Sequence, residues 1–368
     1  MKKILCGALL AALLLVLLSA CGRKAETPVP AAESAEAPSS AQRPPVPSGE
    51  IPAQSAAAVF PLLDAPFSDA ESEEMVNHNC ARFSLVDVDR YYTRGYFDDG
   101  SCGLFRYTVV DAVLRDRAVL LFDCGADYLT QKDGRLYFLG EAGRIESVLP
   151  DGTERRTELD EPCRSLQNGD GIFYCLTAEG TLLALRESGA EPLLGGCGWA
   201  FVSREGIFYT ALADGRAHLY RPGTHTDLVL TQEAAEKPTV IGQRLYYLAE
   251  ESGGLHLRAL DLVSGETFRL ERALAEPADF IRLGGGWALR FAPADAPARQ
   301  LCAACGTVFD ERAVFSDFSA SGPLRCRGLD GDLRTEELLD ENGRPVGTAL
   351  VLPDGRSYAS YGAETPRK

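Results

Sequence analysis

The chain has 368 residues, of which 45% are hydrophobic and 24% are charged, and its formal net charge is −16. So negative a surface repels phosphate backbones and anionic lipid headgroups, which excludes nucleic acid as an expected partner. Basic peptides or positively charged protein faces are the partners that the charge favours. The sequence has no phosphate-binding glycine loop and no dinucleotide fingerprint, so we expect no cofactor.

Residues 1–20 are predicted to be an export signal. Lys2 and Lys3 precede an apolar run of 15 residues, which is too short for a typical membrane span. The tetrapeptide Leu18-Ser19-Ala20-Cys21 that follows resembles the lipobox of bacterial lipoproteins. The resemblance implies cleavage before Cys21 and a thioether-linked lipid on its sulfur; the alternative is an ordinary secretory signal with a coincidental cysteine. The predicted location is extracytoplasmic, lipid-anchored to the bacterial cell membrane.

Residues 21–58 are predicted to be the lipidated cysteine and a disordered tether. Pro, Ala, Ser and Glu dominate this range, which therefore has too little apolar surface to offset the entropy of ordering. A flexible coil of about 35 residues places its ends roughly 30–40 Å apart, enough to hold a domain away from a membrane. Residues 59–362 are predicted to form one folded domain, and residues 363–368 a short tail.

The middle of the chain repeats one pattern four times. Each copy has a triplet of one aliphatic residue followed by two aromatic residues, and then two turn glycines. Three markers that keep one spacing indicate an internal repeat. The triplets are Leu136-Tyr137-Phe138, Ile172-Phe173-Tyr174, Ile207-Phe208-Tyr209 and Leu245-Tyr246-Tyr247; the glycines are Gly143, Gly180, Gly215 and Gly254, then Gly152, Gly189, Gly223 and Gly265.

The close spacing of the turn glycines predicts strands. It leaves room for a strand and too little for a typical helix, and the segments between are rich in residues that favour strands. Four short strands in about 36 residues make one blade of a β-propeller, so the predicted fold is all-β, a single β-propeller of four-stranded blades. Tyr137, Tyr174, Tyr209 and Tyr247 are expected on the second strand of successive blades, largely buried between sheets.

The flanks of the repeat fit the same unit less regularly. An earlier blade runs from Phe83 to Phe122, a sixth unit opens at Trp287-Ala288-Leu289, and a seventh runs from Ala313 to Val351. We predict seven blades, with six or eight as alternatives. Val59–Leu63 and Ser357–Tyr361 are the segments expected to close the ring by pairing strands from both ends of the domain.

Residues 133–272, and more loosely 84–352, resemble the bacterial repeat propellers related to the YWTD type of the low-density-lipoprotein receptor. Leu219-Tyr220-Arg221 is the best copy of the element that ends the matching pattern. No Tyr-Trp-Thr-Asp tetrapeptide occurs, so the calcium and ligand chemistry of that receptor is not implied. The resemblance implies the fold and the location.

The cysteines do not form a recognisable disulfide framework or metal site. Eleven are present, and Cys302 and Cys305 make the only Cys-x-x-Cys pair, with Cys326 as a third member of the cluster. Zinc prefers four ligands, commonly from two such pairs, so a disulfide within the cluster, buried free thiols and a metal all stay open. Cys175 lies in an apolar strand and is expected in the core.

No other residue type makes a catalytic pattern. His218 and His256 occupy matching places in adjacent repeats, which favours packing over catalysis, and Trp199 and Trp287 are expected in the core. The acidic segment at Asp330 matches a calcium loop for only three positions. We therefore predict no catalytic and no metal-binding residues.

The predicted function is a membrane-anchored lipoprotein whose propeller is a binding scaffold, and a monomer. Its partner would be an envelope protein or an extracellular ligand, a basic one being the natural match, and its binding residues are not identified by the sequence. The alternative is an extracytoplasmic hydrolase or lyase that acts on glycan or peptide, with carboxylates from different blades over the central axis.

Overall fold

The computed structural model describes most of the predicted domain, all within the compact unit Val46–Lys368. Cys21 and the rest of the unit Met1–Pro45 lie outside the described residues. No helix among the residues described is long and apolar enough to cross a membrane. The described ranges are 55–79, 81, 84–87, 89–96, 102–110, 113–114, 119–123, 125–269, 273–274, 279–283, 286–291, 300–303, 314–317, 326–329, 333–339, 345–351 and 357–360.

The fold is an all-β propeller, as the sequence predicts. The strands described form seven sheets, and within each sheet successive strands pair antiparallel. The four sheets of the central repeat are β7 (Asp127–Lys132), β8 (Arg135–Leu139), β9 (Ile145–Val148) and β10 (Arg156–Leu159); β11 (Cys163–Gly169), β12 (Ile172–Thr177), β13 (Leu182–Arg186) and β14 (Gly189–Leu194); β15 (Cys197–Ser203), β16 (Gly206–Ala211), β17 (Arg216–Arg221) and β18 (Thr226–Ala234); and β19 (Glu236–Ile241), β20 (Arg244–Glu251), β21 (Gly254–Asp261) and β22 (Thr267–Arg269).

Three flanking sheets complete the described set. In the first of them β4 is the longest strand and pairs with β3, β5 and β6. The three sheets are β2 (Ser84–Asp87), β3 (Arg90–Tyr96), β4 (Cys102–Val110), β5 (Val113–Leu114) and β6 (Val119–Phe122); β23 (Asp279–Leu283), β24 (Gly286–Phe291), β25 (Gln300–Ala303) and β26 (Val314–Asp317); and β27 (Cys326–Leu329), β28 (Leu333–Leu339), β29 (Pro345–Val351) and β30 (Ser357–Ser360). Two 3-10 turns, η1 (Glu141–Gly143) and η2 (Pro222–Thr224), join strands of the central repeat.

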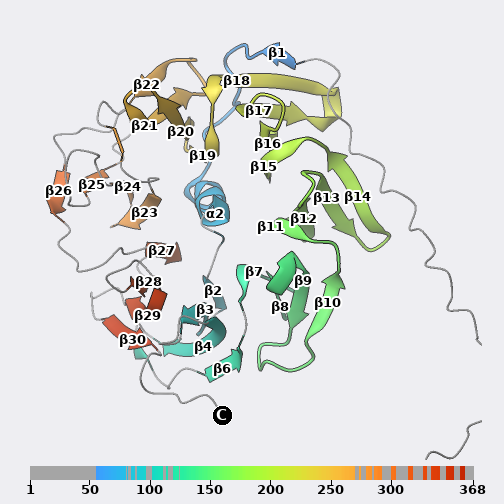
Figure 1. Ribbon diagram of the computed structural model, residues 1–368, viewed down its shortest axis with the longest axis vertical. Coiled ribbons are helices and arrows are strands. Elements are labelled where there is room, and N and C mark those ends of the chain that lie inside the picture. Colours follow the sequence, from blue (N-terminus) through green and yellow to red (C-terminus); the bar gives the residue numbers. More distant parts are fainter. Residues whose placement is uncertain are drawn as a thin grey trace, which may run out of the picture. The chain divides into compact units, whose positions relative to one another are not determined.

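The sheets follow one another around a centre (Figure 1). In five places the first strand of one sheet contacts the first strand of the next sheet. The contacting pairs are β2–β7, β7–β11, β11–β15, β23–β27 and β27–β2. Between the remaining neighbours, β16 contacts β19, and Tyr246 of β20 packs on Phe280 of β23 with ring centroids 5.0 Å apart. These seven sheets match the predicted number, while the blade count of the whole chain stays a prediction.

The turn glycines fix how closely adjacent sheets approach. Gly143 has φ +72°, and a Cβ on it would lie 2.5 Å from the carbonyl oxygen of Cys163, the first residue of the next sheet. Gly180 repeats this arrangement one sheet later, with φ +88° and a Cβ that would lie 2.7 Å from the carbonyl oxygen of Cys197. Only glycine fits both the left-handed backbone and the close contact, so the repeated glycine is a packing requirement between blades.

The triplets occupy the second strands, as predicted, and the burial of their tyrosines differs from one copy to the next. Phe208 is 1% exposed, and Cys175 beside the second triplet is fully buried. Tyr209 and Tyr247 are buried, but Tyr137 and Tyr174 are only half-buried. The expected burial is therefore complete for Tyr209 and Tyr247 and partial for Tyr137 and Tyr174, each of which packs against a core cluster.

Among the described residues, no strand from the start of the domain pairs with a strand from its end. Residues 59–63 form no strand, and β30 pairs only with β29 of its own sheet. Closure is instead lateral, because β2 contacts β27 and β3 contacts β29. The seventh unit also begins later than predicted, since Val314–Asp317 is the last strand of the sixth sheet.

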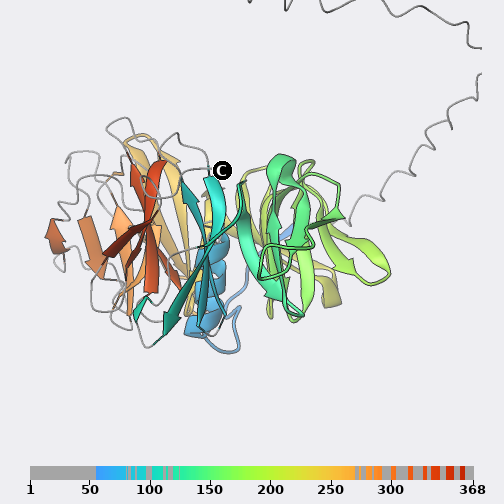
Figure 2. The ribbon, with the colours of Figure 1, turned by 90° about the horizontal axis from the view of Figure 1, so that it is seen from below.

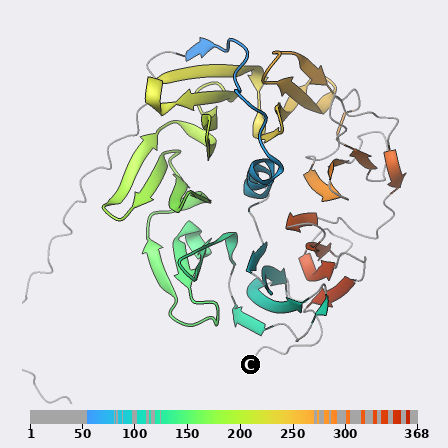
Figure 3. The same cartoon turned by 180° about the vertical axis from the view of Figure 1, so that it is seen from behind.

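The segment before the first sheet has two elements that the sequence analysis did not predict. Strand β1 (Ser55–Ala57) lies within the range assigned to the tether and pairs parallel with β18. Helix α2 (Asp69–Asn79) lies in the centre of the ring, among the strands in the side view and inside the ring when seen from behind (Figures 2 and 3). A segment that precedes the blades therefore lies inside the ring that they form.

Candidate functional site

Helix α2 begins with a capping box. The backbone N–H and the hydroxyl of Ser68 donate to Glu71 Oε2 at 2.8 and 2.7 Å, and the Glu71 N–H donates to Ser68 Oγ at 3.3 Å. This reciprocal bonding satisfies N–H groups that have no partner inside a helix. The Ser-x-x-Glu spacing was the signal in the sequence that could have located the helix.

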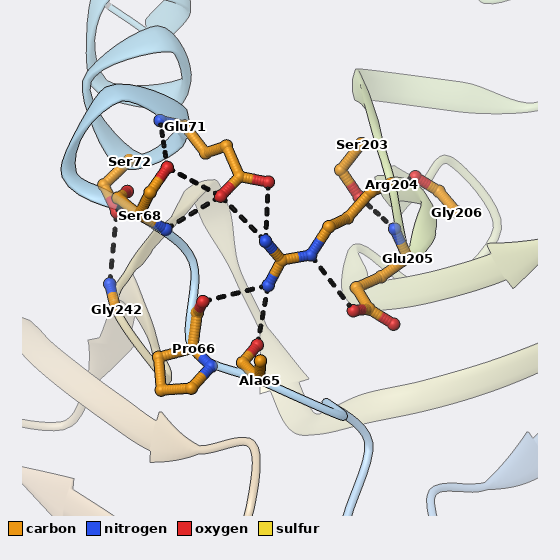
Figure 4. Close-up of polar contacts among 10 residues, drawn as sticks. All are labelled: Ala65, Pro66, Ser68, Glu71, Ser72, Ser203, Arg204, Glu205, Gly206 and Gly242. Carbon is orange, nitrogen blue, oxygen red and sulfur yellow. Dashed lines mark hydrogen bonds and ion pairs between the residues drawn. The ribbon is translucent and has the colours of Figure 1, made fainter.

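The beginning of α2 is held by Arg204, in the turn between β15 and β16 (Figure 4). Its guanidinium donates to both oxygens of Glu71 at 2.8 Å and to the carbonyl oxygens of Ala65 and Pro66 at 2.6 and 3.0 Å. It also lies 4.6 Å from the ring centroid of Phe67. One arginine thus fixes both the helix and the segment that leads into it.

The end of α2 is held by the neighbouring sheets. His78 Nε2 lies 3.0 Å from the carbonyl oxygen of Ala200, and its ring packs against Trp199 with centroids 5.8 Å apart. The Asn79 amide donates to the carbonyl oxygens of Lys237 and Pro238 at 3.1 and 3.3 Å. These contacts position two segments, around 199 and around 237, that also border an open groove.

The groove lies where the sheet β15–β18 meets the sheet β19–β22, and it has a volume of about 540 Å³. Small residues make much of its lining, and Leu212 stands at its edge with 57% of its surface exposed. Its lining is more apolar than polar, with a few charged residues, as is common in ligand-binding clefts. The lining comprises Gly198, Trp199, Thr210, Ala211, Leu212, Gly215, Ala234, Ala235, Glu236, Lys237, Leu248, Glu250 and Leu255.

Charged residues border the groove. Glu236 and Glu250 are exposed, and neither carboxylate has an ion-pair partner in the part of the chain that the structure describes. Their neighbours Glu233 and Glu251 differ, because both pair with Arg258 at 3.0 and 2.8 Å. Lys237 is the one cation among the lining residues and has φ +41°, a conformation that non-glycine residues rarely adopt.

A buried ionic network lies below the turn that carries Leu212. His218 Nδ1 lies 3.0 Å from Asp227 Oδ2, its Nε2 lies 3.4 Å from Asp214 Oδ1, and the hydroxyl of Tyr209 donates to Asp227 Oδ1 at 2.9 Å. The hydroxyl of Ser55 in β1 also donates to Asp227, which ties the start of the described domain to β18.

The network changes the pKa of its members. Burial alone would lower the pKa of His218, but the bond to Asp227 and the charges of Asp227 and Asp214 outweigh it and raise that pKa. Burial opposes ionisation of Asp227, yet the bonds from His218, Ser55 and Tyr209 hold its pKa below the ordinary value. Burial and the adjacent Asp227 raise the pKa of Tyr209, which therefore stays a hydrogen-bond donor.

The residues singled out in the sequence are placed as follows. Trp199 is half-buried rather than a core residue, because it packs on the core with one part and lines the groove with another. His218 and His256 are both buried, as a packing position requires. No group of side chains that could hold a metal occurs within the described ranges. The side chains of Trp287, Cys302, Cys305, Cys326 and Asp330 lie outside what the structure describes.

No pattern in the sequence predicts the groove. Its lining comes from two blades, and its residues are separated by up to 57 positions between Gly198 and Leu255. Glycine, alanine and leucine at these places are ordinary strand and turn residues. Only the packing of neighbouring sheets shows that they border one space.

Comparison with known proteins identifies the fold alone. No protein-family model matches the chain, and no curated protein matches it. A puromycin-hydrolyzing peptidase of Mycobacterium tuberculosis superposes with a TM-score of 0.52 and 14% identity over 85% of this chain; the match spans 58% of the length of the peptidase. BamB from Moraxella catarrhalis has a TM-score of 0.41 and 13% identity over 75% of this chain and 95% of BamB. YCF48 bound to D1 peptide has a TM-score of 0.46 and 14% identity over 77% of this chain and 94% of YCF48.

Proposed function

We propose that the protein is a lipid-anchored extracytoplasmic scaffold that binds a partner protein through the groove between β15–β18 and β19–β22. The observation that carries the proposal is the open groove between two neighbouring sheets, beside a helix that lies in the centre of the ring. Helix α2 lies in the centre of the ring, and the partner is assigned to the groove on the face of the propeller beside it. On that face, the exposed Leu212 beside small residues offers a partner an apolar contact.

The alternative, a hydrolase or lyase, is less well supported. It requires two carboxylates about 5–10 Å apart around an accessible axial pocket. The axis is occupied by α2, whose Ser72, Met75, Val76, Asn77 and His78 are buried against the surrounding sheets. Glu71, at the start of that helix, is engaged with Arg204 and Ser68. These contacts mean that the Glu71 carboxylate holds the start of the helix in place.

Crosslinking in living cells tests the scaffold. Formaldehyde is applied to cells that produce the unaltered protein, Leu212→Ser or Val263→Ser, and the crosslinked partners are identified by mass spectrometry. Val263 is the matched control because it is also an exposed aliphatic residue, at 39%, and does not line the groove. We expect one protein partner with the unaltered chain and Val263→Ser, and its loss with Leu212→Ser. Equal crosslinks with all three would refute the groove as the binding site.

The anchor is tested separately. Cys21→Ala removes the thiol that the lipobox resemblance assigns to the lipid, so the variant should be released from the membrane or remain an unprocessed precursor. Membrane fractionation and the intact mass of the product distinguish these outcomes. A variant that is fully processed and still membrane-bound would show that Cys21 is not the anchor.

A further inference from the structure

We propose that the groove binds an extended peptide segment that places an apolar side chain on the floor of small residues and a lysine or arginine beside Glu236 and Glu250. This rests on the proposed function and names the chemistry of the partner. A binding groove needs an apolar anchor and a polar group that sets orientation. Each of these has a counterpart among the lining residues.

The apolar part follows from the size of the residues on the floor. Gly198 and Gly215 have close neighbours within the lining, since a Cβ on Gly198 would lie 3.1 Å from Thr210 Oγ1 and one on Gly215 would lie 3.2 Å from Ala234 Cβ. With alanines beside them, these glycines leave open the space that larger residues would fill. Trp199 and Leu212 border this space, so an inserted aliphatic or aromatic side chain loses water contact against apolar surface.

The basic part follows from the charges on the rim. Two carboxylates and one ammonium line the groove, and the described residues provide no ion partner for Glu236 or Glu250. The net charge of −16 adds a long-range attraction for cationic segments and a repulsion for acidic ones. A cation of the partner can therefore pair with Glu236 or Glu250 without breaking an existing ion pair. Glu233 and Glu251 differ, because both already pair with Arg258.

The test uses three short fluorescein-labelled peptides with alternating residues, one of leucine and lysine, one of leucine and glutamate, and one of serine and lysine. Binding to the full chain, purified in a mild detergent, is followed by fluorescence anisotropy at low and high salt. The leucine–lysine peptide should bind at least about tenfold more tightly than either other peptide, and high salt should weaken it several-fold. Equal binding of the leucine–glutamate peptide would overturn the charge requirement, and equal binding of the serine–lysine peptide would overturn the apolar one.

Variants locate the site. The double variant Glu236→Gln with Glu250→Gln should lose about tenfold in affinity for the leucine–lysine peptide and most of its salt dependence, whereas Glu187→Gln, at an exposed acid on another sheet, should change neither. Leu212→Ser should weaken the same peptide while Val263→Ser does not. If the double variant binds as the unaltered chain does, the basic partner is refuted, and the scaffold still stands where Leu212→Ser removes the in-cell crosslink. If that crosslink survives Leu212→Ser, the scaffold itself falls.

Discussion

At the scale of single residues, Phe208 shows how the repeated triplet contributes to stability. Its side chain is 1% exposed and packs edge-on against Phe67, with centroids 6.1 Å apart, in the cluster that also contains Met75 of α2. The second strand of this blade therefore contacts both its neighbouring sheet and the segment that leads into the axial helix.

Truncating Phe208 to alanine should leave a cavity and lower the free energy of unfolding by about 3–5 kcal/mol. Urea denaturation of the two proteins measures the difference. Asp214 is a poor control, although its turn position predicts a solvated side chain, because it contacts His218 at 3.4 Å and accepts the N–H of Arg216 at 3.0 Å. Glu187→Ala, at an exposed turn, should change stability by less than about 0.5 kcal/mol. A Phe208→Ala effect as small as that of Glu187→Ala would contradict the observed burial.

His218 gives the molecule a predictable pH dependence. Its pKa is raised in the folded state, so its contribution to stability is complete below its unfolded pKa of about 6.5 and is lost as pH rises through the folded pKa. Asp227 has a lowered pKa, so its contribution is complete above about 3.9 and is lost as pH falls through the folded pKa. Stability from this network should therefore be greatest between about pH 4 and 6.5.

Denaturant midpoints measured at several pH values test this dependence. His218→Gln keeps a hydrogen-bond donor and loses the titration, so the decline above about pH 6.5 should be smaller in this variant than in the unaltered chain. His225→Gln, at an exposed position after η2, should retain the decline. Parallel pH profiles for the unaltered protein and His218→Gln would show that protonation of His218 does not cause the pH dependence of stability.

At the scale of elements, α2 is held by specific polar contacts more than by an apolar face. Asn77 and His78 are buried alongside Met75 and Val76, and Gly242 N–H donates to Ser72 Oγ at 3.1 Å. Such a helix has few of the apolar residues that make a helix stable by burial alone. Its position in the axis therefore depends on the residues at its two ends.

Arg204→Ala should loosen the start of α2 and lower the free energy of unfolding by about 1–3 kcal/mol, because four hydrogen bonds to a charged group are lost. Hydrogen exchange should be faster in the amides of residues 69–75. Arg204→Lys should not restore protection, since an ammonium cannot bridge a carboxylate and two carbonyls in a plane. Arg186→Ala, which removes the exposed pair with Glu191 at 2.5 Å, should cost less than about 1 kcal/mol and leave α2 unchanged. Unchanged exchange in Arg204→Ala would show that the arginine does not hold the helix.

At the scale of the whole molecule, lateral closure makes each sheet depend on both of its neighbours. The last sheet contacts the first through β27 with β2 and β29 with β3, and contacts the sixth through β27 with β23. Removing one sheet from a ring exposes two apolar faces, whereas removing the end of an open array exposes one. The ring should therefore unfold as a unit.

A chain that ends before β27 should lose the cooperative urea transition followed by circular dichroism, while a chain that begins at Val46 should keep the midpoint of the full chain. The second chain lacks only the separate unit Met1–Pro45 and is the control for truncation itself. A sharp transition in the chain without its last sheet, reduced only in amplitude, would indicate independent sheets instead of a closed ring.

The repeated blade could be predicted from the sequence, because apolar strand residues and turn glycines are local requirements that recur at a fixed spacing. The triplets at 136, 172, 207 and 245 lie on second strands for this reason, and Gly143 and Gly180 lie at their turns. The roles of the residues outside the repeat could not be predicted in this way, because they depend on contacts between distant parts of the chain. The closure, the docking of Ser55–Ala57 on β18 and the axial position of α2 depend on contacts between residues more than 100 positions apart, such as Glu71 with Arg204. The groove is of the same kind, since its residues are unremarkable in their own strands and become a site only where two sheets pack together.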